Sequence, residues 1–252
     1  MVTRDALVAY LDAYLSVGKF QDYAPNGLQV EGREAITRIC TAVTASEAAI
    51  QEACFREADA LLVHHGYFWR GEDPVICGMK RRRLGLLMVN DLSLFAYHLP
   101  LDCHPELGNN ARLANMLGVV DVQTHTQGKT PDLLWSGKRP TPLMANELSD
   151  LLNQQLQRMP LHVAGTDRPI ERLAWCSGGA QDFIEDAAKL GVDAYLSGEI
   201  SERTYYQAKE LNIHYFSCGH HATERGGIQA LGEHLHTRFG LQHLFIDSEN
   251  PV

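Results

Sequence analysis

The chain repeats one arrangement of strands and helices, and this repeat restricts its fold more than any other feature of the sequence. The segment Ile36-Thr-Arg-Ile39 aligns with Ile170-Glu-Arg-Leu173 at an offset of 134 residues. The same offset aligns residues 58–62 with residues 192–196, with no gap between the two matches. Ungapped registration over about thirty residues favours a duplication over a chance likeness of two strand–helix–strand units.

Apolar runs and capping residues predict that strands alternate with helices in both halves. The expected strands cover residues 36–43, 59–63, 92–97, 171–176, 193–196 and 213–217. The expected helices cover residues 3–15, 46–56, 78–90, 109–117, 181–190 and 202–211, with Thr3 and Ser46 as N-caps. Residues 22–32 are turn-rich, and residues 130–142, with three prolines, read as a linker that contains a short strand at 133–135.

This alternation predicts an α/β fold with three layers, α/β/α, in each half. We expect a first half at residues 1–128 and a second at residues 129–252, with a C-terminal segment able to pack back on the first half. The repeat is what predicts two similar, intertwined α/β halves.

Composition excludes several classes of protein. The formal net charge of −9 argues against a nucleic acid as the main partner. All apolar stretches are short, which argues against a membrane span, and residues 1–15 lack the apolar core of a signal peptide. The six cysteines show no disulfide-framework or Cys-x-x-Cys spacing, so we expect a cytoplasmic protein.

The unalternating run Leu61-Leu-Val-His-His-Gly66 reads as a strand that is buried on both faces and ends in two histidines. Open α/β sheets bind ligands at the carboxyl ends of their strands, so His64 and His65 are candidate ligand-binding residues. Adjacent residues of a strand point to opposite sides, so the pair serves one metal each, or one metal if the backbone turns at Gly66. A pair of hydrogen-bonded surface histidines is the alternative.

Two further imidazole–carboxylate pairs follow equivalent strands. His98 and Asp102 come after the strand at 92–97, and His220 and Glu224 come after the strand at 213–217. The second half carries Gly198 and Glu199 where the first carries its histidine pair, so the site is not symmetric.

Mixed imidazole and carboxylate ligands suit first-row divalent metals and not calcium. Because these ligands exceed what one tetrahedral ion needs, a two-metal site is the economical interpretation. The alternatives are surface ion pairs and, for Glu224, a favourable position near a helix N-terminus.

Three segments together resemble the Nif-three-like family, and within it the short bacterial members described as GTP cyclohydrolase homologues. They are His64-His65-Gly66, His98-Leu-Pro-Leu-Asp102 with the following residues to Asn110, and Gly219-His-His-Ala-Thr-Glu224-Arg-Gly-Gly227. The segment from Asp22 to Gly32 is also similar. The resemblance spans nearly the whole chain. It implies a dinuclear metal centre in a toroidal homohexamer, with His64, His65, Asp102, His220 and Glu224 as ligands and Glu224 bridging.

The resemblance implies a metal-dependent hydrolase acting on a nucleotide, like GTP cyclohydrolase, with two divalent ions of iron, zinc or manganese per chain. His98 and His221 are then the candidate general acid–base groups, although His98 is also a candidate ligand. A non-enzymatic protein that binds metal or a partner through the same residues is the alternative. Tyr67, Phe68 and Trp69 form either a stacking wall for a flat base or part of the core. The basic run from Lys80 to Arg83 either grips a phosphate or forms a solvated face.

Overall fold

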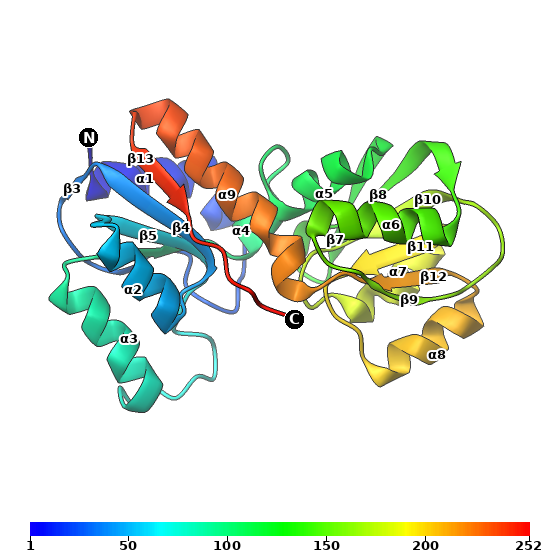
Figure 1. Ribbon diagram of the computed structural model, residues 1–252, viewed down its shortest axis with the longest axis horizontal. Helices are drawn as coiled ribbons and strands as arrows, with labels where there is room; N and C mark the ends of the chain where they lie inside the picture. The colour runs from blue at the N-terminus through cyan, green and yellow to red at the C-terminus, as the bar shows by residue number, and fades with distance from the viewer. The chain divides into compact units, whose positions relative to one another are not determined.

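The computed structural model describes residues 1–252 and divides into two compact units. The first unit comprises Met1–Gly108 and Gly227–Glu249, and the second comprises Asn109–Gly226 and Asn250–Val252. Each unit has one large sheet with helices against both faces (Figure 1), so the expected α/β fold with three layers is confirmed. No helix combines the length and the apolar character that crossing a bilayer requires.

The first unit contains a five-stranded sheet in the order β13-β4-β5-β6-β2. Its strands are β2 (Gly27–Val30), β4 (Arg38–Thr44), β5 (Ala60–His65), β6 (Ser93–Ala96) and β13 (Gln242–Phe245). Strands β13, β4, β5 and β6 run parallel, and β2 pairs with β6 in the antiparallel sense. The short strands β1 (Val2–Thr3) and β3 (Ala35–Ile36) form a separate pair.

Helices cover both faces of this sheet because the apolar side chains of its strands alternate between the two faces. On one face lie α1 (Arg4–Tyr14) and α9 (His220–Phe239), where Leu7 and Leu231 pack with Leu62. On the other lie α2 (Glu47–Phe55) and α3 (Gly78–Val89), where Ile50 packs with Leu61. The expected N-caps Thr3 and Ser46 accept main-chain N–H bonds in the first turns of α1 and α2. The remaining helices are η1 (Val17–Lys19) and α4 (Leu99–Asp102).

The second unit contains a six-stranded sheet in the order β7-β8-β10-β11-β12-β9, in which β10, β11 and β12 run parallel. Its strands are β7 (Val120–Gln127), β8 (Thr130–Leu143), β9 (Leu161–Val163), β10 (Ile170–Trp175), β11 (Ala194–Ser197) and β12 (His214–Ser217). Helices α5 (Asn109–Leu117) and α6 (Ala145–Leu156) pack on one face. Helices η2 (Gln181–Phe183), α7 (Ile184–Lys189) and α8 (Glu202–Leu211) belong to the other.

Each unit contains the same pair of hydrogen bonds, at positions that differ by the offset of the sequence repeat. The carboxylate of Asp59 accepts the main-chain N–H groups of residues 37 and 38, at 2.7 and 2.9 Å. The carboxylate of Asp193 accepts those of residues 171 and 172, at 3.0 and 2.8 Å. The agreement of these side-chain contacts supports the duplication, since two unrelated strand–helix–strand units have no reason to share them.

Two expectations about the middle of the chain were wrong. Residues 130–142 are not a linker, because β8 spans Thr130–Leu143 and pairs with both β7 and β10. The short strand expected at 133–135 lies within β8. Its prolines fall outside the paired registers, so they do not interrupt the ladder. The boundary between the units differs from the expected one at residue 128. Strand β7 pairs with β8, so the first unit ends at Gly108, and it later regains the segment that contains β13.

Candidate metal centre

Strand β5 ends in the two adjacent histidines, two residues later than the sequence pattern indicated. His64 is fully buried and His65 is half-buried. Their ring centroids lie 4.6 Å apart, so the two side chains converge at the end of the strand. Gly66 follows, and a Cβ there would overlap the side chain of Gln29. Gln29 Oε1 accepts the main-chain N–H of Tyr67 at 2.7 Å. The absence of a side chain at Gly66 leaves room for Gln29 to make this hydrogen bond just after the histidines.

His98 and Asp102 lie after β6, at the two ends of the short helix α4. His98 Nδ1 lies 2.7 Å from Oδ1 of Asp22, whose Oδ2 accepts the N–H of Leu99 at 3.0 Å. Burial raises the pKa of Asp22, but the hydrogen bond and the charge of His98 outweigh it and lower that pKa to about 2. Asp22 therefore holds the His98 ring. The sequence assigned Asp22 no role of its own, although it lies in the turn-rich segment at 22–32 that is similar to the family.

These side chains converge within the first unit. One ring nitrogen from each of His64, His65 and His98 lies within 4.8 Å of the others. His64 Nε2 lies 3.5 Å from Asp102 Oδ1, and Asp102 is buried. The first unit therefore supplies three imidazoles and one carboxylate at the carboxyl ends of β5 and β6.

The second unit supplies the other expected pair from the first turns of α9. His220 is the first residue of this helix, and its Nε2 lies 3.3 Å from Oε1 of the buried Glu224. Its Nδ1 lies 2.6 Å from Oε1 of Glu199, which occupies the position equivalent to His65. Burial lowers the pKa of His220, but Glu224 and Glu199 outweigh it and raise that pKa to about 9.

Gly178, which follows β10, makes room for this pair. Its φ is +66°, and a Cβ there would overlap Glu224 Oε1 and lie 3.2 Å from His220 Nε2. Its N–H is held by Thr223 Oγ1 at 3.0 Å. The main-chain N–H of the preceding residue, Ser177, donates to Asn110 Oδ1 at 2.9 Å. The sequence assigned no role to Gly178, and Asn110 entered only as the last residue of a segment that resembles the family.

All four of these histidines have the same ring orientation, with Nδ1 bonded to an oxygen. The oxygens are Tyr97 O for His64 at 2.9 Å, Thr44 Oγ1 for His65 at 3.2 Å, Asp22 Oδ1 for His98 at 2.7 Å and Glu199 Oε1 for His220 at 2.6 Å. Metal-binding histidines commonly use one ring nitrogen in this way, which fixes the ring and leaves the other nitrogen for the metal. The imidazoles and buried carboxylates therefore fit a divalent transition metal.

Other residues singled out from the sequence have structural surroundings that explain them. His221 is 7% exposed, and its main-chain N–H donates to Val252 O at 3.0 Å. Within the basic run, Lys80 pairs with Glu72 and Arg82 with Glu47, at 3.1 and 3.0 Å. These two cations are thus engaged by carboxylates of this chain.

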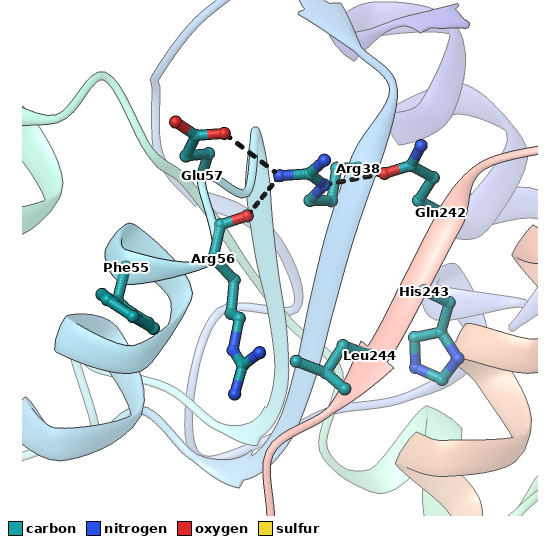
Figure 2. Close-up of a pocket in the computed structure, with 7 residues that line it drawn as sticks. All are labelled: Arg38, Phe55, Arg56, Glu57, Gln242, His243 and Leu244. Atoms are coloured by element: carbon teal, nitrogen blue, oxygen red, sulfur yellow. Dashed lines mark hydrogen bonds and ion pairs between the residues drawn. The ribbon is translucent and has the colours of Figure 1, made fainter.

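A cavity of about 400 Å³ opens at the opposite end of the first sheet (Figure 2). It is lined by Arg38, Phe55, Arg56, Glu57, Gln242, His243 and Leu244. Arg38 and Gln242 are the first residues of the parallel strands β4 and β13, whereas His64 and His65 end β5. The Arg38 guanidinium bonds Gln242 Oε1 and the carbonyl of Arg56, at 2.8 and 2.5 Å. This cavity contains none of the expected metal ligands.

Comparison with known proteins agrees with the fold. A Vibrio cholerae protein named GTP cyclohydrolase 1 type 2 homolog is 54% identical over 248 residues, which cover 98% of each chain. An Escherichia coli K12 protein of the same name is 50% identical over 239 residues, covering 94% of this chain and 95% of the relative.

The solved structure of the protein ybgI, described as of unknown function, superposes with a TM-score of 0.95 at 47% identity, with 100% of both chains covered. A solved structure from Thermus thermophilus superposes with a TM-score of 0.91 at 37% identity, again over 100% of both chains. The family model described as Duf34/NIF3 (NGG1p interacting factor 3) matches residues 2–251. The chain therefore belongs to the Duf34/NIF3 family.

Proposed function

We propose that this protein is a metal-dependent hydrolase that acts on a nucleotide through a dinuclear divalent-metal centre. In this proposal the ligands are His64, His65 and Asp102 from the first unit and His220 and Glu224 from the second, with Glu224 bridging. The observation that carries the proposal is the shared orientation of the three ligand imidazoles, His64, His65 and His220, each with Nδ1 on an oxygen. A purely surface role would not require three rings to be fixed in the same way.

The number of donors supports joint binding by both sets. Two ions at four to six coordination take about eight to twelve bonds, and five protein ligands with one bridge supply about six. The ligands of one unit alone would supply fewer bonds than two ions need. Nitrogen and oxygen donors together suit iron, zinc or manganese. The remaining coordination would be open, as in catalytic sites and unlike closed structural ones.

Bound divalent ions would lower the pKa of a coordinated water molecule to near neutrality and polarise the bond to be cut. Side chains of the protein would carry out the proton transfer. The Asp22 carboxylate accepts from Nδ1 of His98, which directs Nε2 of that ring to exchange a proton with the substrate. His221 is the second candidate, but its side chain is more buried than that of His98.

The substrate class rests on the relatives. Their shared name, GTP cyclohydrolase 1 type 2 homolog, points to a nucleotide, with opening of a purine ring as the specific version. Hydrolysis of a phosphoester suits the same ligands. We further propose a homohexamer that acts in the cytoplasm. Light scattering should then return several times the 28.1 kDa chain mass, and a monomer at every concentration would contradict this assembly.

The test is a panel of nucleoside triphosphates, cyclic nucleotides and phosphoesters, each with manganese, zinc or iron supplied. Asp102→Ala should lower turnover by about 100-fold or more, because it removes a ligand and the loss of mere supporting contacts already costs about 10- to 100-fold. Asp182→Ala, which removes an exposed carboxylate paired with Arg203, is the control and should match wild type.

Turnover that survives unchanged in Asp102→Ala would contradict the proposal, because it would come from another protein in the preparation. If no substrate reacts with any metal while a metal acceptor or protein partner binds, the non-enzymatic interpretation replaces this one.

A further inference from the structure

Trp69 lies against two of the candidate metal-site histidines. Its ring centroid is 5.0 Å from that of His98, edge to face at 80°, and 6.0 Å from that of His65. All three residues belong to the first unit. The Trp69 side chain is half-buried, so part of the indole remains accessible.

The two aromatic residues before Trp69 serve other purposes. Tyr67 is buried, and its hydroxyl donates to the carbonyl of Ala45 at 2.5 Å. Phe68 is 39% exposed, with Lys80 Nζ 5.5 Å from its ring centroid. The ring of Trp69, by contrast, lies against both His65 and His98.

Hydrogen bonds within residues 66–72 hold both the side chain and the main chain of Trp69. Trp69 Nε1 donates to the carbonyl of Gly66 at 3.1 Å, and its main-chain N–H donates to Glu72 Oε2 at 3.0 Å. Glu72 N–H donates back to Trp69 O at 2.9 Å, which closes a tight turn with Gly71 at φ +85°. Phe68 has φ +66°, a conformation that bulky residues rarely adopt and that is often found at functional sites.

The same loop is fastened to the segment that orients His98. Arg70 donates its main-chain N–H to Tyr23 O at 2.7 Å and a guanidinium N–H to Asp22 O at 3.1 Å. Asp22 is the residue whose carboxylate holds the His98 ring. Hydrogen bonds of Arg70 and Asp22 therefore link the positions of Trp69 and His98.

We infer that Trp69 is a positioning residue that stacks a flat nitrogen heterocycle of the substrate, such as a purine base, beside the metal-site histidines. The inference rests on the proposed function only for the identity of the substrate as a nucleotide. An aromatic side chain that stacks one base changes affinity by about 5- to 150-fold. Stacking requires the base and not the sugar phosphate, so the ligand must carry an aromatic ring.

The chain has three tryptophans, and this makes a direct optical test available. Trp135 and Trp175 are 4% and 0% exposed, so a bound base should quench mainly Trp69. We expect GMP to quench the fluorescence of the full-length protein and ribose 5-phosphate to leave it unchanged. Trp69→Phe should remove most of the quenching while calorimetry still detects GMP binding, because phenylalanine also stacks.

Trp69→Leu should weaken GMP binding by about 5- to 150-fold with metal content unchanged. Phe68→Leu, an exposed neighbour in the same loop, is the matched control and should bind like wild type. Equal GMP affinity in Trp69→Leu and wild type would overturn the inference. So would a loss of metal in Trp69→Leu, which would indicate a purely structural role.

The two proposals fail in different ways. If GMP binding depends on Trp69 but no nucleotide is hydrolysed, the stacking role stands and the hydrolase does not. If a phosphoester without an aromatic ring is hydrolysed equally well by wild type and Trp69→Leu, and GMP does not bind, the hydrolase stands and the stacking role is wrong.

Discussion

Gly178→Ala tests whether the geometry of the second donor set matters for metal binding. The new Cβ would overlap Glu224 Oε1 and approach His220 Nε2 to 3.2 Å, so the carboxylate has to move. The backbone at φ +66° adds strain of about 1–2 kcal/mol for any residue with a Cβ. We expect the free energy of unfolding to fall by at least about that amount, and metal affinity to fall by about 10- to 100-fold.

Gly191→Ala is the matched control in the same unit. Gly191 has φ +68°, and a Cβ there meets nothing within 4 Å, so this variant carries the strain without the overlap. The equivalent position in the first unit is Glu57 at φ +54°, which shows that this turn accepts a side chain. The control should lose about 1–2 kcal/mol of stability and bind metal like wild type.

Urea unfolding of both variants measures the strain, and calorimetric titration with manganese or zinc measures the affinity. The difference between the two variants isolates the displacement of Glu224 and His220. If Gly178→Ala binds metal as tightly as Gly191→Ala, then the positions of these two side chains do not govern metal binding, and the reasoning is refuted.

Two further predictions concern buried carboxylates. Asp22→Asn should lower turnover or metal affinity by about 10- to 100-fold without unfolding the protein, because His98 loses its charged acceptor; wild-type values for both would show that Asp22 only fastens the turn. For Asp59, burial raises the pKa, but the N–H groups of Arg38 and Thr37 outweigh it, so the folded pKa lies below the unfolded one. Its stabilisation is present above the unfolded value of about 4 and is lost as pH falls through the folded pKa. Urea unfolding should therefore show a steeper loss of stability on acidification for wild type than for Asp59→Asn, and parallel curves would contradict this.

The sequence predicted those parts of the fold that local patterns encode. The bounds of α8 match the expected helix, and the caps at Thr3 and Ser46 are in place, because capping and helical periodicity act over a few residues. Only residues 133–135 of strand β8 were predicted, because its prolines dominate the local signal. Whether those prolines interrupt the strand depends on its register with β7 and β10, which no local pattern gives.

The candidate site shows the same division. The histidines and carboxylates stand out as residue types at the ends of predicted strands, so the sequence could indicate them. Asp22 contacts His98 across 76 residues, and the need for a glycine at position 178 arises from Glu224 and His220. Contacts of this kind depend on the packing of separate elements, and no local pattern encodes them.

The metal content of the protein tests the central proposal most directly. Full-length protein should be purified without chelator, equilibrated with manganese, zinc or iron(II), and measured by elemental analysis. We predict about two ions per chain in wild type and in Glu233→Ala, a control on the same helix. Glu224→Ala should lose both ions together if Glu224 bridges them. A wild-type content that stays below about one ion per chain in metal-replete buffer would contradict the dinuclear centre.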